Sequence, residues 1–275
     1  MHTSPAAIGS NRTKLHRSRA GGVEHLELQP GASAPAGENS EYQIVFPYSG
    51  IFGIEVGRKS TFVDPNRLVF IAPGQCFKKT LPVDGLGYSV AAVTPGPELL
   101  LEFGPTSRTQ LHEAAQDMSR PATMRSRVLA HQLLSCAADR SADGLRRDEL
   151  LISSVEEALA LAPMRTRLIS RSIVNRAKEV LHARAADRLS LNEVAAQVGV
   201  SPVYLTQTFT KAEGIPLHRY QLRLRLSRAL VALPNCQCIH SLALELGFSS
   251  QSHFGSSFKS AFGMTAAQFR TLMRS

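Results

Sequence analysis

A run of uncharged side chains that donate and accept hydrogen bonds, Gln251-Ser252-His253, lies within the stretch ELGFSSQSHFGSSFKSAFG. Such side chains can recognise a surface that presents a fixed pattern of donors and acceptors. The edges of DNA bases are one such surface, because a Gln amide can bond N6 and N7 of adenine together, Ser can bond any base, and His can donate or accept. Phe254 and Phe258 follow at i, i+4 spacing and would anchor the inner face of a helix that carries this polar run.

The same arrangement occurs earlier in the chain, in LSLNEVAAQVGVSPVYLTQTF, which resembles CIHSLALELGFSSQSHFGSSF. The shared positions form an i, i+3, i+4, i+7 apolar stripe followed by a glycine and then a Ser that can cap a second helix. The stripes are Leu191, Val194, Ala195 and Val198, then Ile239, Leu242, Ala243 and Leu246; the glycines are Gly199 and Gly247; the caps are Ser201, and Ser249 or Ser250. The pattern predicts two helix-turn-helix units, at about 191–213 and about 239–262.

In a helix-turn-helix, the first half of the second helix faces base edges in the major groove. We therefore take as candidate base-reading residues Val203, Thr206, Gln207, Gln251, Ser252, His253 and Ser256. The candidate phosphate contacts are Ser201, Lys211, Arg223, Arg228, Ser250 and Lys259. The alternative is that these are ordinary solvated residues, and that Arg223, Arg225 and Arg228 form internal ion pairs.

The segment between the two units, PLHRYQLRLRLSRALVAL, contains an alternating QLRLRL that would suit a strand. Its leucines nevertheless recur at helical spacing, and Tyr220 with Leu224 lie on another side. The sequence therefore favours a long helix, apolar on two sides, that packs against both units. Some 17 helical residues span roughly 25 Å, a spacer compatible with major grooves about 34 Å apart on one face of DNA.

The charge is divided unevenly along the 275 residues. Residues 1–165 contain 17 Lys+Arg and 17 Asp+Glu, whereas residues 166–275 contain 14 and 5, so the second segment carries the whole net charge of +9 (14 − 5). A basic segment beside a neutral one indicates a polyanionic partner, either nucleic acid or an anionic membrane. No run approaches about 18 consecutive apolar residues, so the sequence predicts no membrane span, and the motifs favour DNA.

The first half of the chain has a different pattern. Residues 40–103 are rich in β-branched and aromatic residues between turn signals, which predicts a sandwich or small barrel. Residues 124–140 and 146–162 show helical periodicity, and these helices would cover an open side of the β unit or form a dimer surface. We expect a disordered tail at 1–20, a first domain at 21–163, a boundary near 163–166 and a second domain at 166–275. The tail lacks the apolar middle of a secretory signal and only faintly resembles a transit peptide.

Residues 166–275 resemble the AraC/XylS family of bacterial transcription regulators throughout, through SLNEVAAQVGVSPVYLTQTFTKAEGIPLHRYQLRLRLSRAL and SLALELGFSSQSHFGSSFKSAFGMTAAQFR. The resemblance implies an α+β two-domain fold, with an N-terminal cupin-like β-barrel followed by helices and a C-terminal all-α domain of two helix-turn-helix units joined by a long helix. It implies double-stranded DNA and RNA polymerase as partners, a homodimer, and a place at the nucleoid in the bacterial cytoplasm. The chain departs from the family at Gln207 and Ser256, where an Arg is common, and at Ala266, where a Pro is usual.

The first half is similar, more loosely, to family members with a cupin-like sensory domain, through DPNRLVFIAPGQCFKKTLPVDG. Residues 40–103 contain no His, so we expect no metal site of the cupin kind and no metal-dependent catalysis. A small-molecule effector would bind in a pocket lined by Phe46, Phe52, Phe70, Phe77 and Tyr88. Packing of these aromatic side chains in a β core is the alternative.

Three functional hypotheses follow. The chain is a regulator whose first domain senses a small molecule or a partner; or it is a ligand-independent regulator whose first domain only dimerises; or, remotely, it is a DNA alkylation-response protein with Cys76 or Cys136 as methyl acceptor. The four cysteines do not have metal-binding spacing, and Cys236-Gln-Cys238 reads as two incidental thiols or as a redox or metal element. We expect no catalytic residues and no cofactor.

Overall fold

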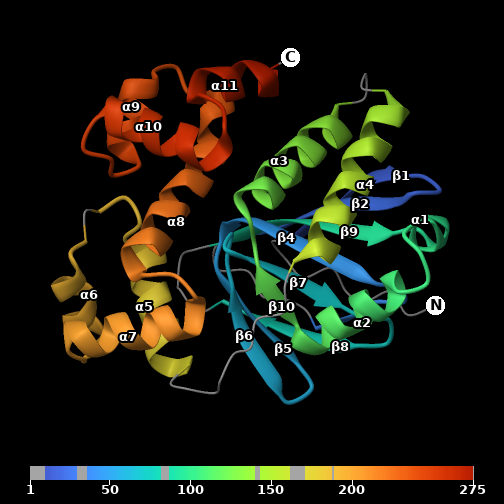
Figure 1. Ribbon diagram of the computed structural model, residues 1–275, viewed down its shortest axis with the longest axis horizontal. Helices are drawn as coiled ribbons and strands as arrows, with labels where there is room; N and C mark the ends of the chain where they lie inside the picture. The colour runs from blue at the N-terminus through green and yellow to red at the C-terminus, as the bar shows by residue number, and fades with distance from the viewer. Residues whose placement is uncertain are drawn as a thin grey trace. The chain divides into compact units, whose positions relative to one another are not determined.

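The computed structural model describes residues 10–29, 36–81, 87–139, 143–161, 171–187 and 189–274. The chain divides into two compact units, residues 1–164 and residues 165–275, the first rich in strands and the second helical (Figure 1). The boundary expected near 163–166 lies outside the described residues. Among the described helices, none is both long enough and apolar enough to cross a membrane.

The first unit contains two antiparallel sheets. A six-stranded sheet has the order β1 (Ser10–Arg17), β2 (Gly21–Leu28), β9 (Tyr88–Pro95), β4 (Gln43–Gly50), β7 (Arg67–Ile71) and β10 (Ser119–Pro121). A four-stranded sheet has the order β3 (Gly37–Glu38), β8 (Cys76–Thr80), β5 (Phe52–Val56) and β6 (Lys59–Val63). The sequence predicted a sandwich or a small barrel. The described strands form two open antiparallel sheets, each with its own hydrogen-bond ladder.

Helices cover one face of the six-stranded sheet, and the four-stranded sheet covers the other. The helices are α1 (Pro97–Glu102), α2 (Ser107–Asp117), α3 (Met124–Ala138) and α4 (Gly144–Ala160). Leu133 of α3 and Val155 of α4 are fully buried against Ile44 and Val93 of the sheet. The prediction that the two longer helices cover the β unit is therefore confirmed. The opposite face contributes Leu28, Val45 and Val90 to a second core shared with β5.

The prediction of a disordered tail at 1–20 is wrong for residues 10–17. These residues form β1, which pairs along its length with β2, from Ser10 opposite Leu28 to Arg17 opposite Gly22. SNRTKLHR contains one aliphatic side chain, so its composition resembles a solvated tail. An edge strand needs only backbone pairing and one covered face, and neither requires a hydrophobic sequence.

The five aromatic residues predicted to line an effector pocket do not lie together. Phe46 and Phe70 are buried in the core beneath the helices. Phe52 and Tyr88 are buried in the core between the sheets, with their ring centroids 4.3 Å apart, and the half-buried Phe77 packs at its edge. Four of the five, Phe46, Phe52, Phe70 and Tyr88, are buried β-core residues, as the alternative of β-core packing states. Phe52, Phe77 and Tyr88 belong to one cluster.

The second unit consists of helices. α5 (Arg171–Ala183) precedes α6 (Leu191–Val198) and α7 (Pro202–Glu213), α8 (Leu217–Ala232) and a 3-10 turn (Leu233–Asn235) follow, and α9 (Ile239–Glu245), α10 (Gln251–Phe262) and α11 (Ala266–Arg274) complete it. QLRLRL lies within α8, so the strand alternative is wrong. Tyr220 and Leu224 are buried with α5, α6 and α7 on one side of α8, and Leu226 and Leu230 are buried on the other. The predicted all-α domain with two helix-turn-helix units joined by a long helix is confirmed.

A buried ion pair joins α5 to the first helix-turn-helix unit. Nζ of Lys178 on α5 is 2.9 Å from a carboxylate oxygen of Glu213 at the end of α7, and both side chains are almost fully buried. The Lys178 ammonium also lies 5.5 Å from the ring centroid of Tyr220 on α8. Lys178 therefore connects α5 to α7 and α8. Because both charged groups are buried, each needs the other to offset its loss of hydration.

Candidate nucleic-acid interface

Both helix-turn-helix units turn at a glycine in the left-handed region. Gly199 has φ = 78° and Gly247 has φ = 82°, a backbone conformation that residues other than glycine adopt only at a cost in free energy. Their surroundings differ. A Cβ on Gly199 would find its nearest neighbour 3.7 Å away, at the Arg176 guanidinium, whereas a Cβ on Gly247 would lie 2.6 Å from the carbonyl oxygen of Ala186. The second turn thus packs against the chain that joins α5 to α6.

The recognition helices begin at serine caps. The Ser201 hydroxyl accepts from the backbone N–H of Tyr204 at 3.2 Å, and the Ser250 hydroxyl accepts from that of His253 at 3.1 Å. Of the alternatives Ser249 and Ser250, the cap is Ser250. Each cap uses a lone pair of its oxygen, so the hydroxyl hydrogen can be donated to a phosphate. The first-turn N–H groups, positively polarised, point the same way.

Aromatic packing fixes which side of α10 faces out. Phe254 and Phe258 are fully buried, with ring centroids 5.6 Å apart, and Phe248 and Phe269 stack on them at 5.1 and 5.8 Å. Gln251, Ser252, His253 and Ser256 are all exposed on the remaining surface of the helix. The structure therefore leaves all four candidate base-reading residues of the second helix-turn-helix unit accessible on the surface of α10.

These four side chains differ in their freedom to bind a partner. The amide of Gln251 and the hydroxyl of Ser252 make no hydrogen bond to any described residue. Nδ1 of His253 is 3.0 Å from the Ser249 hydroxyl, and its ring rests edge-on against Phe248, so its direction is fixed while Nε2 points away from that contact. The hydroxyl of Ser256 donates to the carbonyl oxygen of His253 at 3.1 Å, which leaves it only as an acceptor.

The first recognition helix, α7, presents a less polar face. Val203 is 67% exposed, and Gln207 is exposed with no hydrogen bond to any described residue. The Thr206 hydroxyl donates to the carbonyl oxygen of Pro202 at 2.9 Å, as Ser256 does in the second unit. Leu205 and Phe209 are fully buried and hold the inner face. The predicted apolar contact at Val203 therefore has a freely accessible side chain.

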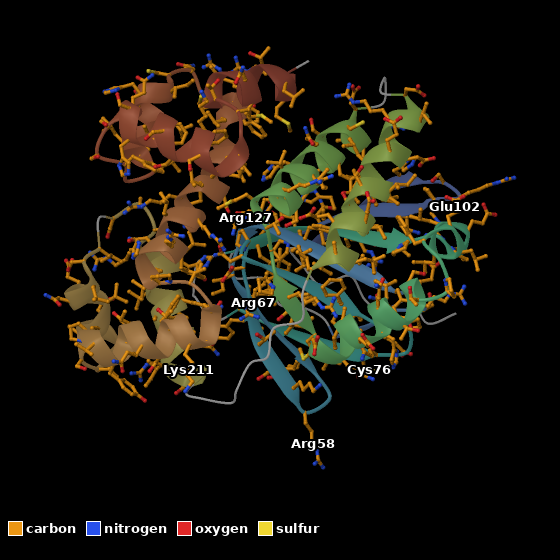
Figure 2. All side chains as sticks on the ribbon, in the orientation of Figure 1. Arg58, Arg67, Cys76, Glu102, Arg127 and Lys211 are labelled. Atoms are coloured by element: carbon orange, nitrogen blue, oxygen red, sulfur yellow. The ribbon has the colours of Figure 1, made fainter. Side chains whose placement is uncertain are left out.

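The candidate phosphate contacts fall into two groups. Lys211 and Lys259 are exposed in the last turns of α7 and α10, and Figure 2 shows Lys211 on the outside of its helix. Arg223 is half-buried, and burial together with the neighbouring guanidinium of Arg219 lowers its pKa. Arg228 donates to the carbonyl oxygen of His182 at 3.0 Å and is half-buried. Arg228 is therefore committed to an internal contact, the alternative weighed from the sequence, although its partner is a carbonyl group and not a carboxylate.

Three side chains of α8 join this helix to the end of α5 and to the loop that follows it. Arg228 reaches the end of α5, Arg225 donates to the carbonyl oxygen of Asp187 at 2.8 Å, and the Gln221 amide reaches the same oxygen at 3.5 Å. The Arg225 guanidinium is also the neighbour 3.2 Å from a Cβ built on Gly247. The link between the two recognition helices is thus braced by contacts as well as by the helix itself.

Sequence reasoning missed two exposed residues beside the candidates. Tyr204 follows Val203 on α7 and is 46% exposed. Arg219 is exposed one helical turn before Arg223, and their electrostatic coupling marks a basic patch on α8. The i, i+4 spacing of two arginines was the available signal for Arg219.

Comparison with known proteins agrees with this geometry. Residues 194–271 match the family described as "Helix-turn-helix domain". The chain is 32% identical over 101 residues to the HTH-type transcriptional activator AarP of Providencia stuartii. The aligned region covers 36% of this chain and 74% of AarP. It is 28% identical over 102 residues to the Msm operon regulatory protein of Streptococcus mutans, 37% of either protein.

Solved structures include a transcriptional regulator with an AraC-type DNA-binding domain from Chromobacterium violaceum, at 31% identity. That likeness covers 38% of this chain and 94% of the other, with a TM-score of 0.36. Among the first curated relatives the chain spans about a third to two fifths of their length. The match to AarP covers most of that relative. The chain therefore belongs to the AraC/XylS family of transcription regulators.

Proposed function

We propose that this regulator binds double-stranded DNA at defined sequences by inserting α7 and α10 into successive major grooves. The observation that carries the proposal is the outward face of α10, where Gln251, Ser252 and His253 project from a serine-capped helix start. Two of these side chains make no hydrogen bond within the described residues, and the third is held in direction by Ser249. Gln251 suits adenine, and the exposed Val203 of α7 suits a thymine methyl.

The electrostatics of the chain supports the same partner. Residues 166–275 carry 14 Lys+Arg against 5 Asp+Glu, so a polyanion is attracted to this unit and not to the neutral first unit. Lys211 and Lys259, each exposed near the end of a recognition helix, would contact phosphates on either side of a groove. Binding should therefore weaken steeply as salt is raised.

The length and bracing of α8 support simultaneous binding by both units. Its 16 residues span about 24 Å, and the short flanking segments add to this. Adjacent major grooves on one face of DNA repeat every ~34 Å. Because Arg225 and Gly247 hold the second helix-turn-helix unit against the loop after α5, the contacts fix the separation between α7 and α10.

The first unit has its own core and would supply regulation. In this proposal it responds to a small-molecule effector or a partner and forms a homodimer, and DNA-bound protein contacts RNA polymerase. A regulator whose first unit only dimerises is the alternative. A thermal-shift screen of metabolites separates the two, because a ligand that binds the folded form raises the unfolding midpoint.

The test is genomic footprinting with the purified full-length protein, repeated over a range of salt concentrations. We expect protected sites that share a sequence and span two adjacent major grooves. A matched variant, Lys211→Gln, should weaken binding to all sites about equally, because a phosphate contact carries no sequence information. Uniform protection with no shared sequence at any salt concentration would overturn the proposal and leave only electrostatic attraction.

A further inference from the structure

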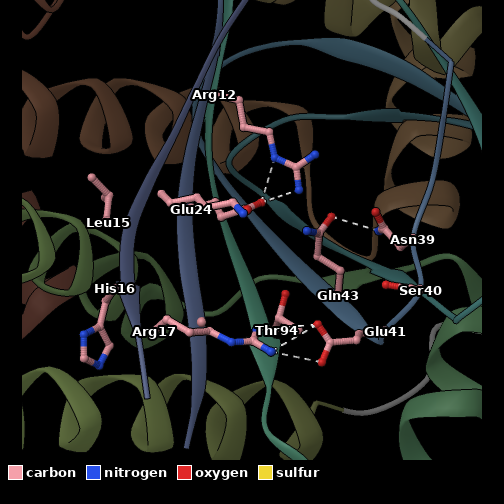
Figure 3. Close-up of a pocket in the computed structure, with 12 residues that line it drawn as sticks. Arg12, Leu15, His16, Arg17, Glu24, Asn39, Ser40, Glu41, Gln43 and Thr94 are labelled. Atoms are coloured by element: carbon pink, nitrogen blue, oxygen red, sulfur yellow. Dashed lines mark hydrogen bonds and ion pairs between the residues drawn. The ribbon is translucent and has the colours of Figure 1, made fainter. Parts of the chain in front are cut away.

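The inner face of the six-stranded sheet changes character along its strands. Leu26 and Leu28 of β2 belong to the apolar core between the sheets, whereas Gly22 and Glu24, on the same side of the strand, line a cavity. The cavity has a volume of about 860 Å³, within the range of small-molecule sites. Figure 3 shows the residues of its walls, which come from β1, β2, β4 and β9 and from the chain before β4.

Two ion pairs lie in the wall of the cavity. Arg12 donates through Nε to a carboxylate oxygen of Glu24 at 2.9 Å, and Arg17 approaches the carboxylate of Glu41 at 3.2 Å (Figure 3). Lys14 also lines the cavity and makes no ion pair with any described residue. The wall therefore holds three Lys or Arg side chains against two carboxylates, and both carboxylates are already paired.

A further cation, Lys79, faces the space between the two sheets from the four-stranded sheet, outside the set of residues that line the cavity. Lys79 pairs with the buried Ile54 across β8 and β5, so both side chains lie on the inner face of the four-stranded sheet. Its ammonium lies 5.3, 5.6 and 6.0 Å from the ring centroids of Phe77, Tyr88 and Phe52. Within the described residues Lys79 has no hydrogen-bond or carboxylate partner. Burial, and to a smaller extent the positive charge of Arg12, lowers the pKa of Lys79 to about 8.

This arrangement is costly for the free protein. A lysine turned inward between two sheets, surrounded by rings and repelled by an arginine, loses hydration, and no carboxylate of the described residues compensates for that loss. Such a group is stabilised when an anion arrives, and cation–π contact alone contributes only about 1–2 kcal/mol. Arg12 and Lys14 line the ligand-sized cavity, and Lys79, whose charge interacts with that of Arg12, adds a third positive charge beside them.

We propose that the space between the sheets binds a small organic carboxylate, with its anionic group held by Arg12, Lys14 and Lys79. The rest of the ligand lies in the cavity, where Asn39, Gln43 and Thr94 offer hydrogen bonds to further polar groups. This inference rests on the proposed sensing role of the first unit and specifies the chemical class of its effector. A cationic ligand is disfavoured, because it would meet more like charges than carboxylates.

The first test needs no ligand. Lys79→Met in the full-length protein removes an inward charge with no anionic partner while keeping the volume of the side chain, so we expect a higher thermal unfolding midpoint than in the unmodified protein. Lys78→Met, on the exposed outer face of the same strand, is the matched control and should leave the midpoint nearly unchanged. A lower midpoint for Lys79→Met would show that the lysine serves the fold through its aromatic contacts, and would overturn the proposal.

The second test uses citrate and succinate as probes, with putrescine and glucose as cationic and neutral controls. In two-dimensional NMR of the full-length protein, the anions should shift amide signals of β1 and β2. Lys14→Gln and Lys79→Met should each weaken anion binding about tenfold, the loss typical of one charge-assisted hydrogen bond, and Lys78→Met should not. The anion proposal falls if neither anion shifts these signals, or if the lysine variants bind as tightly as the unmodified protein.

The controls separate this proposal from the broader one. Signals of β1 and β2 that respond to glucose or putrescine but not to the anions would reject the carboxylate and retain a sensing cavity. No step of either test involves DNA, so footprinting results stand independently of the outcome here.

Discussion

Gly255 lies in the middle of α10, where the fold has no need of a glycine. Apart from its chain neighbours and the backbone of its own helix, a Cβ placed there would find no atom of the described residues within 4 Å, and its backbone φ is not in the left-handed region. By spacing it shares a face with Ser252 and Lys259, both exposed. A glycine inside a helix without a structural reason suggests a close approach by something outside the protein, which in the proposed function is the DNA backbone.

Replacing Gly255 with Ala should therefore separate stability from binding. Ala in place of Gly in a helix interior stabilises by about 1 kcal/mol, and nothing in the surroundings offsets this gain because the methyl group enters open space. For a unit of this size that corresponds to a rise of about 4 °C in the unfolding midpoint. On DNA, a methyl group forced against the sugar-phosphate backbone should cost about 1 kcal/mol or more, roughly a fivefold or greater loss of affinity.

The assay pairs thermal unfolding, followed by circular dichroism, with titration on the best footprinted site. Gly144→Ala is the control: it lies at the start of α4 in the first unit, its Cβ also meets open space, and it should not alter DNA affinity. A lower midpoint for Gly255→Ala would refute the argument from helix propensity. A stabilised variant with unchanged affinity would refute the close approach of DNA.

Three further predictions address the framework of both units. Gly247→Ala should destabilise more than Gly199→Ala, because both incur about 1 kcal/mol of left-handed strain but only the former meets a carbonyl oxygen at 2.6 Å; equal midpoints in thermal unfolding would contradict the packing of the second turn. Lys178→Met should lower the free energy of unfolding, measured in urea, by about 3–5 kcal/mol, because it leaves the Glu213 carboxylate buried without its cation. The double variant Lys178→Met with Glu213→Leu should recover most of this loss, and a double variant as unstable as the single one would refute the ion-pair account. Burial lowers the pKa of His131 to about 4, so between about pH 6.5 and pH 4 the unfolded chain binds a proton that the folded protein does not bind, and the free energy of unfolding should fall by about 3 kcal/mol over this range. His131→Phe should flatten this slope, and an unaltered slope would exclude His131 as its source.

The second half of the fold could be predicted from the sequence because its signals are local and repeated. Apolar stripes, turn glycines and serine caps recur at nearly constant spacing, and the buried Leu205, Phe209, Phe254 and Phe258 fix which faces point out. The exposed candidates of α7 and α10 follow from that geometry. An internal contact of Arg228 was one of the alternatives, but its partner could not be predicted, because the carbonyl oxygen of His182 lies 46 residues away in sequence.

The first half was harder to predict because its structure depends on pairing between distant strands. β1 has a polar sequence and is specified mainly by its ladder with β2. Whether an aromatic side chain faces the helices or the second sheet depends on strand register, and a shift by one residue reverses it. For this reason the sequence did not divide Phe46 and Phe70 from Phe52 and Tyr88, and gave no sign that Lys79 turns inward among the rings.

The central claim, that the polar face of α10 reads bases, is tested most directly by comparing the unmodified protein with Gln251→Ala on every single-base variant of the best footprinted site. The account predicts that the unmodified protein discriminates at one position within the groove occupied by α10 by about 1–3 kcal/mol, and that Gln251→Ala loses this preference while keeping its salt dependence. If Gln251→Ala shows the same preference at every position, α10 does not read DNA through this residue and the account is contradicted.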